Sequence, residues 1–152
     1  MSQSPAPRLL ELIPHRPPML LLSKVVSVSN NSAKALVTIS SESPFVLPGK
    51  GVPASVSLEY MGQTAALIGG YQLEQGVIGP HLGFLLGARQ LTPHRAYFPV
   101  GMTLAVEVSE GTVVNQELAN FECKIFDQHN AELVCEGTLS VLRKLSAELN
   151  NE

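Results

Sequence analysis

Glu59 and Gln63 are the two residues whose types and spacing most clearly suggest chemistry. They stand in an apolar stretch, in which Glu59 is the only charged side chain between Lys50 and Glu74. Their i, i+4 spacing places both on one face of a helix. Burying a carboxyl group is costly unless the group is paired or protonated, and a protonated carboxyl can serve as a general acid. A carboxyl and an amide on a buried helix therefore indicate a functional site.

The sequence leaves other roles open for these two side chains. Glu59 could be a structural carboxylate that forms an ion pair with Arg16 or Arg89. Gln63 could hold Glu59 in place, bond a substrate directly, or be an ordinary polar residue of the helix. A structure that shows the partners of both side chains would decide between these roles.

One long helix must position these residues. The apolar, small-residue stretch predicts a helix from about Ala54 to Gln75, which is buried because it is apolar nearly all round. The backbone N–H groups of Ala54, Ser55 and Val56 at its N-terminus could bind an oxygen on which negative charge develops. An ordinary solvated helix start is the alternative.

Four histidines are the candidate bases. His15 lies between prolines, in a rigid loop that could hold its side chain in one pose; a loop histidine bonded to backbone is the alternative. His81 and His94 are further candidates, and His129 falls in an expected hairpin turn exposed to solvent. The four are scattered without the spacing of metal ligands, so no metal site is predicted.

The expected order of elements is two strands, the long helix and four more strands. Strands are expected at 19–29, 33–41, 82–91, 102–114, 117–127 and 132–143, after a short helical turn at 8–13. Strands around one apolar helix indicate the α+β class, with an antiparallel sheet. Because one helix cannot cover both faces of a flat sheet, we expect a strongly curved sheet that wraps the helix. We expect a disordered tail at 1–8, one domain at 9–145 and a C-terminal tail at 146–152.

Composition argues against several classes of function. A net charge of −3 with 15% charged residues gives no basic stripe for nucleic acid. There is no run of eighteen apolar residues and no signal-peptide pattern, so we expect a cytoplasmic chain without a membrane segment. Cys123 and Cys135 lack metal-ligand spacing and are expected to be reduced and buried. The low charge fraction also predicts that a second subunit covers part of the surface.

Three segments, in the same order, resemble the 3-hydroxyacyl-acyl-carrier-protein dehydratases of type II fatty-acid synthesis. Residues 12–22, LIPHRPPMLLL, are similar to the family opening LPHR-x-P-x-LLLD, and LEYMGQ at 58–63 is similar to its E-x-x-A-Q helix motif. YFPVG at 97–101, with the strand after it, is similar to P-G-D-x-L-x-x-E-V. GFLLGAR at 83–89 is most similar to the ApeP-like dehydratases of aryl-polyene clusters.

This resemblance implies a fold, a reaction and partners. The fold would be a hot-dog, in which a curved antiparallel sheet wraps one long central helix, assembled as a homodimer or a higher oligomer. The reaction would be the dehydration of a 3-hydroxyacyl thioester to the trans-2-enoyl thioester, in fatty-acid or polyene-type synthesis, without a cofactor. The acyl chain would arrive on the phosphopantetheine arm of an acyl carrier protein, for which Lys50, Arg89 and Arg95 could form a basic docking rim.

One position departs from the family pattern. The family carries a catalytic histidine fourteen residues before the helix glutamate, where Phe45 stands here, and no histidine occurs between Arg16 and Pro80. We therefore expect His15 to act as the base and Glu59 as the acid. Two alternatives remain open: a catalytically weak subunit that completes a hetero-oligomeric dehydratase, and an acyl thioesterase in which the carboxylate activates water.

Overall fold

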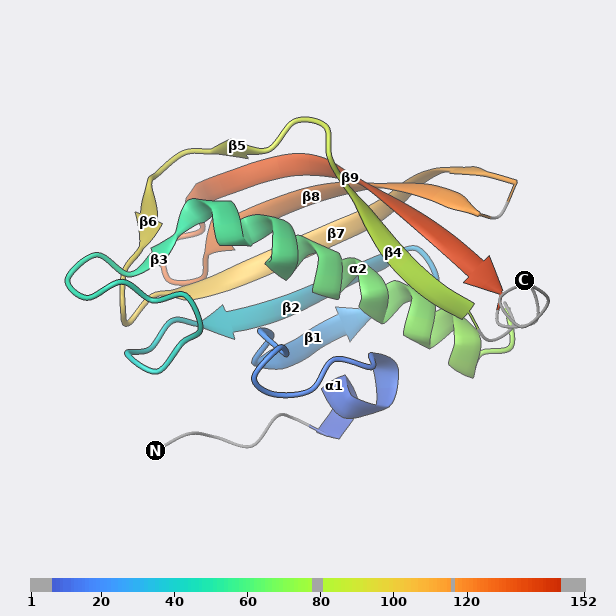
Figure 1. The fold of residues 1–152 in the computed structure, drawn as a ribbon, viewed down its shortest axis with the longest axis horizontal. Helices are drawn as coiled ribbons and strands as arrows, with labels where there is room; N and C mark the ends of the chain where they lie inside the picture. The colour runs from blue at the N-terminus through green and yellow to red at the C-terminus, as the bar shows by residue number, and fades with distance from the viewer. Residues whose placement is uncertain (1–6, 78–80, 116, 146–152) are drawn as a thin grey trace.

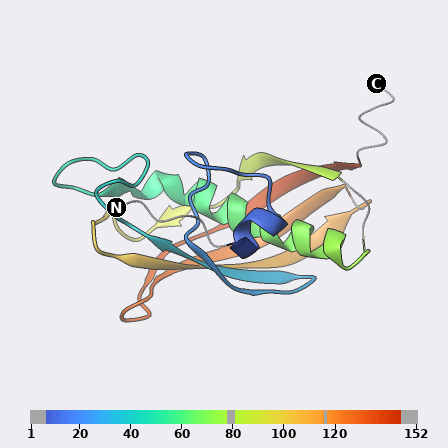
Figure 2. The same cartoon turned by 90° about the horizontal axis from the view of Figure 1, so that it is seen from below.

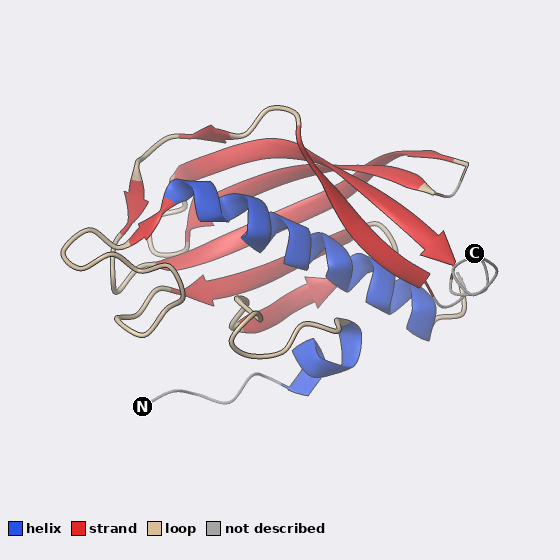
Figure 3. Ribbon diagram, viewed as in Figure 1, coloured by secondary structure: helices blue, strands red, loops and turns tan. Residues whose placement is uncertain are grey.

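An antiparallel sheet with one long helix against it forms the body of the protein (Figures 1 and 3). The computed structural model describes residues 7–77, 81–115 and 117–145. The main sheet has the strand order β1-β2-β7-β8-β9-β4, and β5 pairs with β9. Its strands are β1 (Lys24–Val28), β2 (Ser32–Thr38), β4 (His81–Ala88), β5 (Thr92–Pro93), β7 (Thr103–Val114), β8 (Leu118–Asp127) and β9 (Leu133–Leu145).

The central helix α2 (Ser57–Glu74) follows a 3-10 turn at Ala54–Val56, within the range expected from the sequence. The sheet curves round it, so that β4 and β2 lie on opposite sides of the helix in the view of Figure 2. The face toward the sheet buries Met61, Leu67 and Ile68 among the strand side chains. Burial on so many sides explains why the helix is apolar nearly all round. No helix in the described part of the chain is long and apolar enough to cross a membrane.

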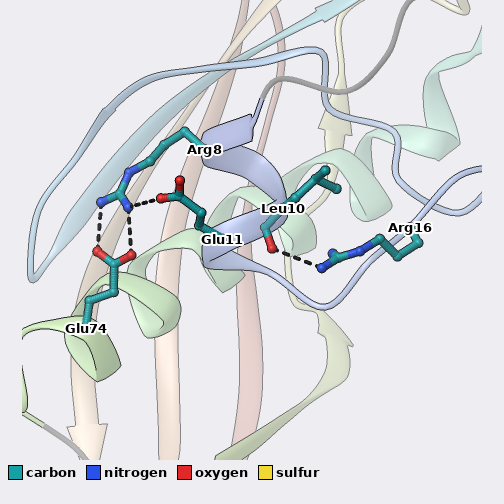
Figure 4. Close-up of polar contacts among 5 residues, drawn as sticks. All are labelled: Arg8, Leu10, Glu11, Arg16 and Glu74. Carbon is teal, nitrogen blue, oxygen red and sulfur yellow. Dashed lines mark hydrogen bonds and ion pairs between the residues drawn. The ribbon is translucent and has the colours of Figure 1, made fainter.

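A short helix, α1 (Pro7–Leu12), packs across the far half of α2. Arg8 forms a two-pronged ion pair with Glu74 at 2.7 and 2.8 Å and also contacts Glu11 at 2.9 Å (Figure 4). The helical turn expected at 8–13 is therefore present. Because α1 begins at Pro7, the expected disordered tail does not extend to residue 8, and residues 1–6 and 146–152 lie outside the described residues.

The strand expected at 19–29 is wrong in its first half. Pairing with β2 begins at Ser23, and residues 20–22 are buried without belonging to a strand. The backbone at Met19 and Leu21 bonds the side chain of Gln63 instead of a neighbouring strand. A short apolar run reads as a strand by periodicity alone, so the sequence could not separate these two cases.

The other five expected strands are present, with ends that differ by a few residues. Two short strands, β3 (Val52–Pro53) and β6 (Tyr97–Phe98), form a separate pair beside the start of α2. These and β5 escaped the sequence analysis because two residues carry no periodic pattern. Cys123 and Cys135 are free and buried as expected, and burial raises the pKa of Cys123 to about 12.

Gly70 permits the close approach of α1 to α2, and this contact can be tested. A Cβ at residue 70 would overlap the carbonyl oxygen of Leu12. We expect Gly70→Ala to lower the free energy of unfolding by about 1–3 kcal/mol, despite the better helix propensity of alanine. The measurement is urea unfolding, with Gly111→Ala as control, because a Cβ there meets its nearest atom at 3.4 Å. Equal stability of both variants would contradict the close packing.

Candidate active site

A cavity of about 550 Å³ lies between α2, the end of α1 and the loop that follows α1. Along α2 it extends from Glu59 to Leu73, and on its other sides it reaches Phe121 of β8 and Arg143 of β9. His15, in the loop after α1, lines the same cavity. A volume in this range is typical of sites for small organic ligands. The cavity therefore contains both residues that the sequence analysis selected as acid and base.

Gln63 is the residue that fixes Glu59 within this site. Its side chain is 1% exposed, and its Oε1 accepts the backbone N–H of Leu21 at 2.9 Å. Because that bond identifies the oxygen, Nε2 must be the donor to the Met19 carbonyl at 2.8 Å and to Oε1 of Glu59 at 3.0 Å. Both N–H groups and the oxygen of the amide are thus engaged within the chain. This arrangement supports a positioning role for Gln63 rather than direct bonding to a substrate.

The carboxyl group of Glu59 has one oxygen engaged by Gln63. An oxygen that accepts an N–H bond is a poor place for the acidic proton, so Oε2 is the oxygen suited to carry and donate it. Within the described ranges neither Arg16 nor Arg89 forms an ion pair with Glu59. The structural ion pair considered as the alternative from the sequence is therefore absent from the described residues.

His15 is half-buried and held by its neighbours through the backbone. Nη1 of Arg16 donates to the carbonyl oxygens of Ile13 at 2.8 Å and His15 at 2.9 Å, and Nη2 donates to that of Leu10 at 3.0 Å (Figure 4). Arg16 thereby closes the C-terminal end of α1 and stiffens the loop. This role was not predicted from the sequence, although a basic residue near the C-terminal end of a helix is a known signal for such capping.

Burial sets the protonation of His15. Desolvation lowers the pKa of His15 below its ordinary value of 6.5, and the nearby Glu59 carboxylate opposes this with a smaller upward effect. The ring is consequently neutral at pH 7 and able to accept a proton. Its Nδ1 atom is buried and has no hydrogen-bond partner among the described residues. A neutral imidazole that lines the same cavity as a carboxyl group can take part in proton transfer.

A second, more apolar cavity of about 380 Å³ meets the first at Glu59, which lines both. Its other walls include Met19, Phe45 and Val56. Phe45, at the position where the resembled family carries its histidine, is 59% exposed. Its backbone has φ of 68°, a conformation uncommon for residues other than glycine. Glu59 is thus accessible from two directions.

Ala54 and Ser55, the two residues at the helix start that are expected to bind substrate, lie in different surroundings. The backbone N–H of Ala54 donates to the carbonyl of Ala96 at 2.9 Å, so the expectation that it would bind a substrate oxygen is wrong in this structure. The β3–β6 pairing, which the sequence did not reveal, brings Ala96 there. Ser55 is exposed, and it lines neither cavity. Its role in binding stays a prediction.

The remaining histidines lie away from the cavity so far as the structure describes them. His94 bonds Glu136 at 2.9 Å on the surface, and His129 is exposed in a turn. The side chain of His81 falls outside the described residues. Of the histidines whose side chains are described, His15 alone lines a cavity with Glu59.

The family model of the ApeP-like proteins, described as ApeP dehydratase, matches residues 7–150. The chain belongs to the ApeP-like dehydratase family. A solved structure of the dehydratase heterocomplex ApeI:P from Xenorhabdus doucetiae is similar, with a TM-score of 0.81 and 26% identity over 94% of this chain and 95% of that chain. A comparison with curated protein sequences found no match.

More distant structures share the fold alone. A hypothetical thioesterase with coenzyme A from Streptococcus pneumoniae TIGR4 has a TM-score of 0.63 and 11% identity over 80% of this chain and 84% of that chain. The PaaI protein of the E. coli phenylacetic acid degradation operon has a TM-score of 0.60 and 14% identity over 79% and 82%. The predicted α+β hot-dog fold and the predicted resemblance to ApeP-like dehydratases are therefore confirmed, and the protein is a dehydratase.

The bridge made by Gln63 can be tested by its effect on stability. Gln63→Leu keeps a similar volume but leaves the Leu21 N–H and the Met19 carbonyl without their partner. Each unpaired buried group costs about 1–3 kcal/mol, so we expect a loss of about 2–5 kcal/mol in the free energy of unfolding. Urea unfolding measures this, with Gln75→Leu at the exposed end of α2 as control. A loss no larger than that of the control would show that the bridge contributes nothing.

Proposed function

We propose that this dehydratase acts on 3-hydroxyacyl thioesters of an acyl carrier protein and releases the trans-2-enoyl thioester. The observation that carries the proposal is that Glu59 and His15 line one cavity that continues along an apolar helix face. The elimination needs a base at C2 and an acid at the hydroxyl of C3, and two groups with different proton affinities meet that need. No electrons are exchanged with a second molecule, so the reaction needs no cofactor.

In the proposed mechanism, His15, which lines the cavity, takes the proton from C2. The electrons of the C2–H bond form the C2–C3 double bond, and the C3–O bond breaks. Oε2 of Glu59 gives its proton to the departing hydroxyl, which leaves as water, while Gln63 continues to bond Oε1. His15 is then protonated and Glu59 ionised, and transfer of the proton from His15 to Glu59 restores the starting state.

The thioester carbonyl needs a donor as negative charge develops on its oxygen. The N–H of Ser55 or that of Val56, both in the 3-10 turn before α2, is the candidate that remains once Ala54 is bonded to Ala96. Its position at the N-terminus of an 18-residue helix favours negative charge. In this arrangement the pantetheine arm enters by the helix start, and the acyl chain follows α2 toward Leu73.

A basic rim beside the helix start supports an acidic carrier protein as partner. The ammonium group of Lys50 lies 5.5 Å from the centre of the Tyr97 ring, and Nε of Arg95 donates to the Tyr97 carbonyl at 2.9 Å. Two cations thus gather around one residue of β6, close to Ala96 and Ala54. Arg89 is exposed on the chain between β4 and β5. Complementary charge would guide the carrier to this end of the protein.

A second candidate is a subunit that completes the active site of a hetero-oligomeric dehydratase. The similar structure from Xenorhabdus doucetiae is a dehydratase heterocomplex, and Phe45 replaces the usual histidine of the resembled family in this chain. In that case the chain alone would turn over slowly, and addition of a second hot-dog subunit would restore activity. Assembly as a homodimer is the form that we propose for the chain by itself.

The acid–base pair is tested by replacing each member. Glu59→Gln keeps the volume but removes the acidic proton, and His15→Ala removes the base. We expect each change to lower the rate of dehydration by about 10²–10⁴-fold. Mass spectrometry of a 3-hydroxyacyl carrier protein follows the loss of one water. Glu107→Gln and His129→Ala, both exposed and remote from the cavity, are the matched controls.

Three outcomes would each contradict part of this proposal. Turnover of His15→Ala at the wild-type rate would exclude His15 as the base. Release of free carrier thiol in place of water loss would indicate a thioesterase, with Glu59 activating water. Activity only in the presence of a second subunit, unaffected by either substitution, would favour the role of a supporting subunit.

A further inference from the structure

The far end of the cavity carries an ion pair that the proposed mechanism does not use. Arg143 of β9 lines the cavity, and its Nη2 donates to Oε2 of Glu110 on β7 at 2.6 Å. The two side chains are only 10% and 13% exposed. Nη1 of Arg143 also contacts Oε1 of Gln72 on α2 at 3.4 Å, and the guanidinium lies 5.8 Å from the centre of the Phe121 ring. Three strands and the helix thus surround one cation.

We propose that Arg143 limits the length of the acyl chain that the cavity accepts; this inference rests on the proposed function. On the α2 side of the cavity, an acyl chain that starts at Glu59 meets only glycine and alanine until it reaches the level of the ion pair. There a terminal methyl group would displace the remaining water from two charges and offer no hydrogen bond in return. This loss of binding free energy applies only to chains long enough to reach Arg143. It therefore limits the chain length that the cavity accepts and does not affect the reacting atoms.

On the α2 side, no large side chain blocks the cavity between Glu59 and the level of Arg143. Between Glu59 and Leu73 the lining residues of α2 are glycines and alanines, namely Gly62, Ala65, Ala66, Gly69 and Gly70. None has a side chain that extends beyond Cβ. Because α1 covers Gly70, the path for an acyl chain follows Gly62, Ala66 and Gly69, where no bulky helix side chain stops it before the level of Arg143.

The distance along the helix gives the expected limit. Gln72, which contacts Arg143, follows Glu59 by thirteen residues, or about 20 Å at 1.5 Å per residue. An extended chain advances about 1.2 Å per bond, because the three backbone bonds of one extended peptide residue together span ~3.5 Å. About sixteen bonds therefore span the interval. Since C3 lies at Glu59 in the proposed mechanism, we expect binding to weaken sharply for acyl chains longer than about nineteen carbons.

The test measures binding of saturated acyl-pantetheine thioesters of increasing chain length to the full chain by calorimetry. Wild-type protein should lose affinity by about tenfold or more once the chain passes the limit. The double variant Arg143→Met with Glu110→Leu replaces the pair by apolar groups, and it should move the limit to longer chains without changing the affinity for short ones. Arg143→Lys keeps a cation at the cavity wall and should keep the limit.

An unchanged limit in the double variant, or no binding of acyl chains by wild-type protein, would overturn the inference. If the double variant does not fold, Arg143→Gln with Glu110→Gln removes both charges while it keeps polar groups that can bond each other. This variant should also lengthen the limit, and an unchanged limit would again overturn the inference. Because the readout is binding, a length limit without any loss of water would refute the proposed function alone.

Discussion

The amide of Gln63 joins the two parts of the chain that carry the candidate acid and base. Its oxygen is fixed by the N–H of Leu21, so both amide hydrogens are available to the Met19 carbonyl and to Glu59. Turning the amide over would leave a buried backbone N–H unpaired, at a cost that keeps the orientation unique. One buried side chain thereby places the loop of residues 19–22 against α2 and leaves Oε2 as the carboxyl oxygen of Glu59 that Gln63 does not bond.

The position of this loop also depends on contacts at its N-terminal end, where it follows α1. Arg16 gathers three carbonyl groups at the end of α1, and Gly70 lets α1 approach α2 closely. The ion pair of Arg8 with Glu74 is exposed, and pairs of that kind contribute little stability. Close packing at Gly70 and the buried bonds of Gln63 are therefore the contacts that hold His15 over the helix face.

The sequence predicted those features of the fold and site that depend on residues close together in the chain. Glu59 and Gln63 stood out because i, i+4 spacing on an apolar helix is visible within five residues, and the strand order followed from alternating runs. It could not predict that Leu21 would bond Gln63, or that Ala96 would occupy the N–H of Ala54. Those contacts join residues 42 positions apart and carry no local signature. Such contacts decide which candidate atoms remain available, so site geometry was the part that required the structure.

The central claim is that His15 and Glu59 share one cavity, and NMR titration of the His15 ring tests it most directly. Burial should place the pKa of His15 below 6.5 in the wild-type protein. Because the Glu59 carboxylate raises that pKa, Glu59→Gln should lower it further, while the signals of surface His94 stay the same in both proteins. A His15 pKa that is identical in wild type and variant would show that the two groups do not face each other, and would contradict the account.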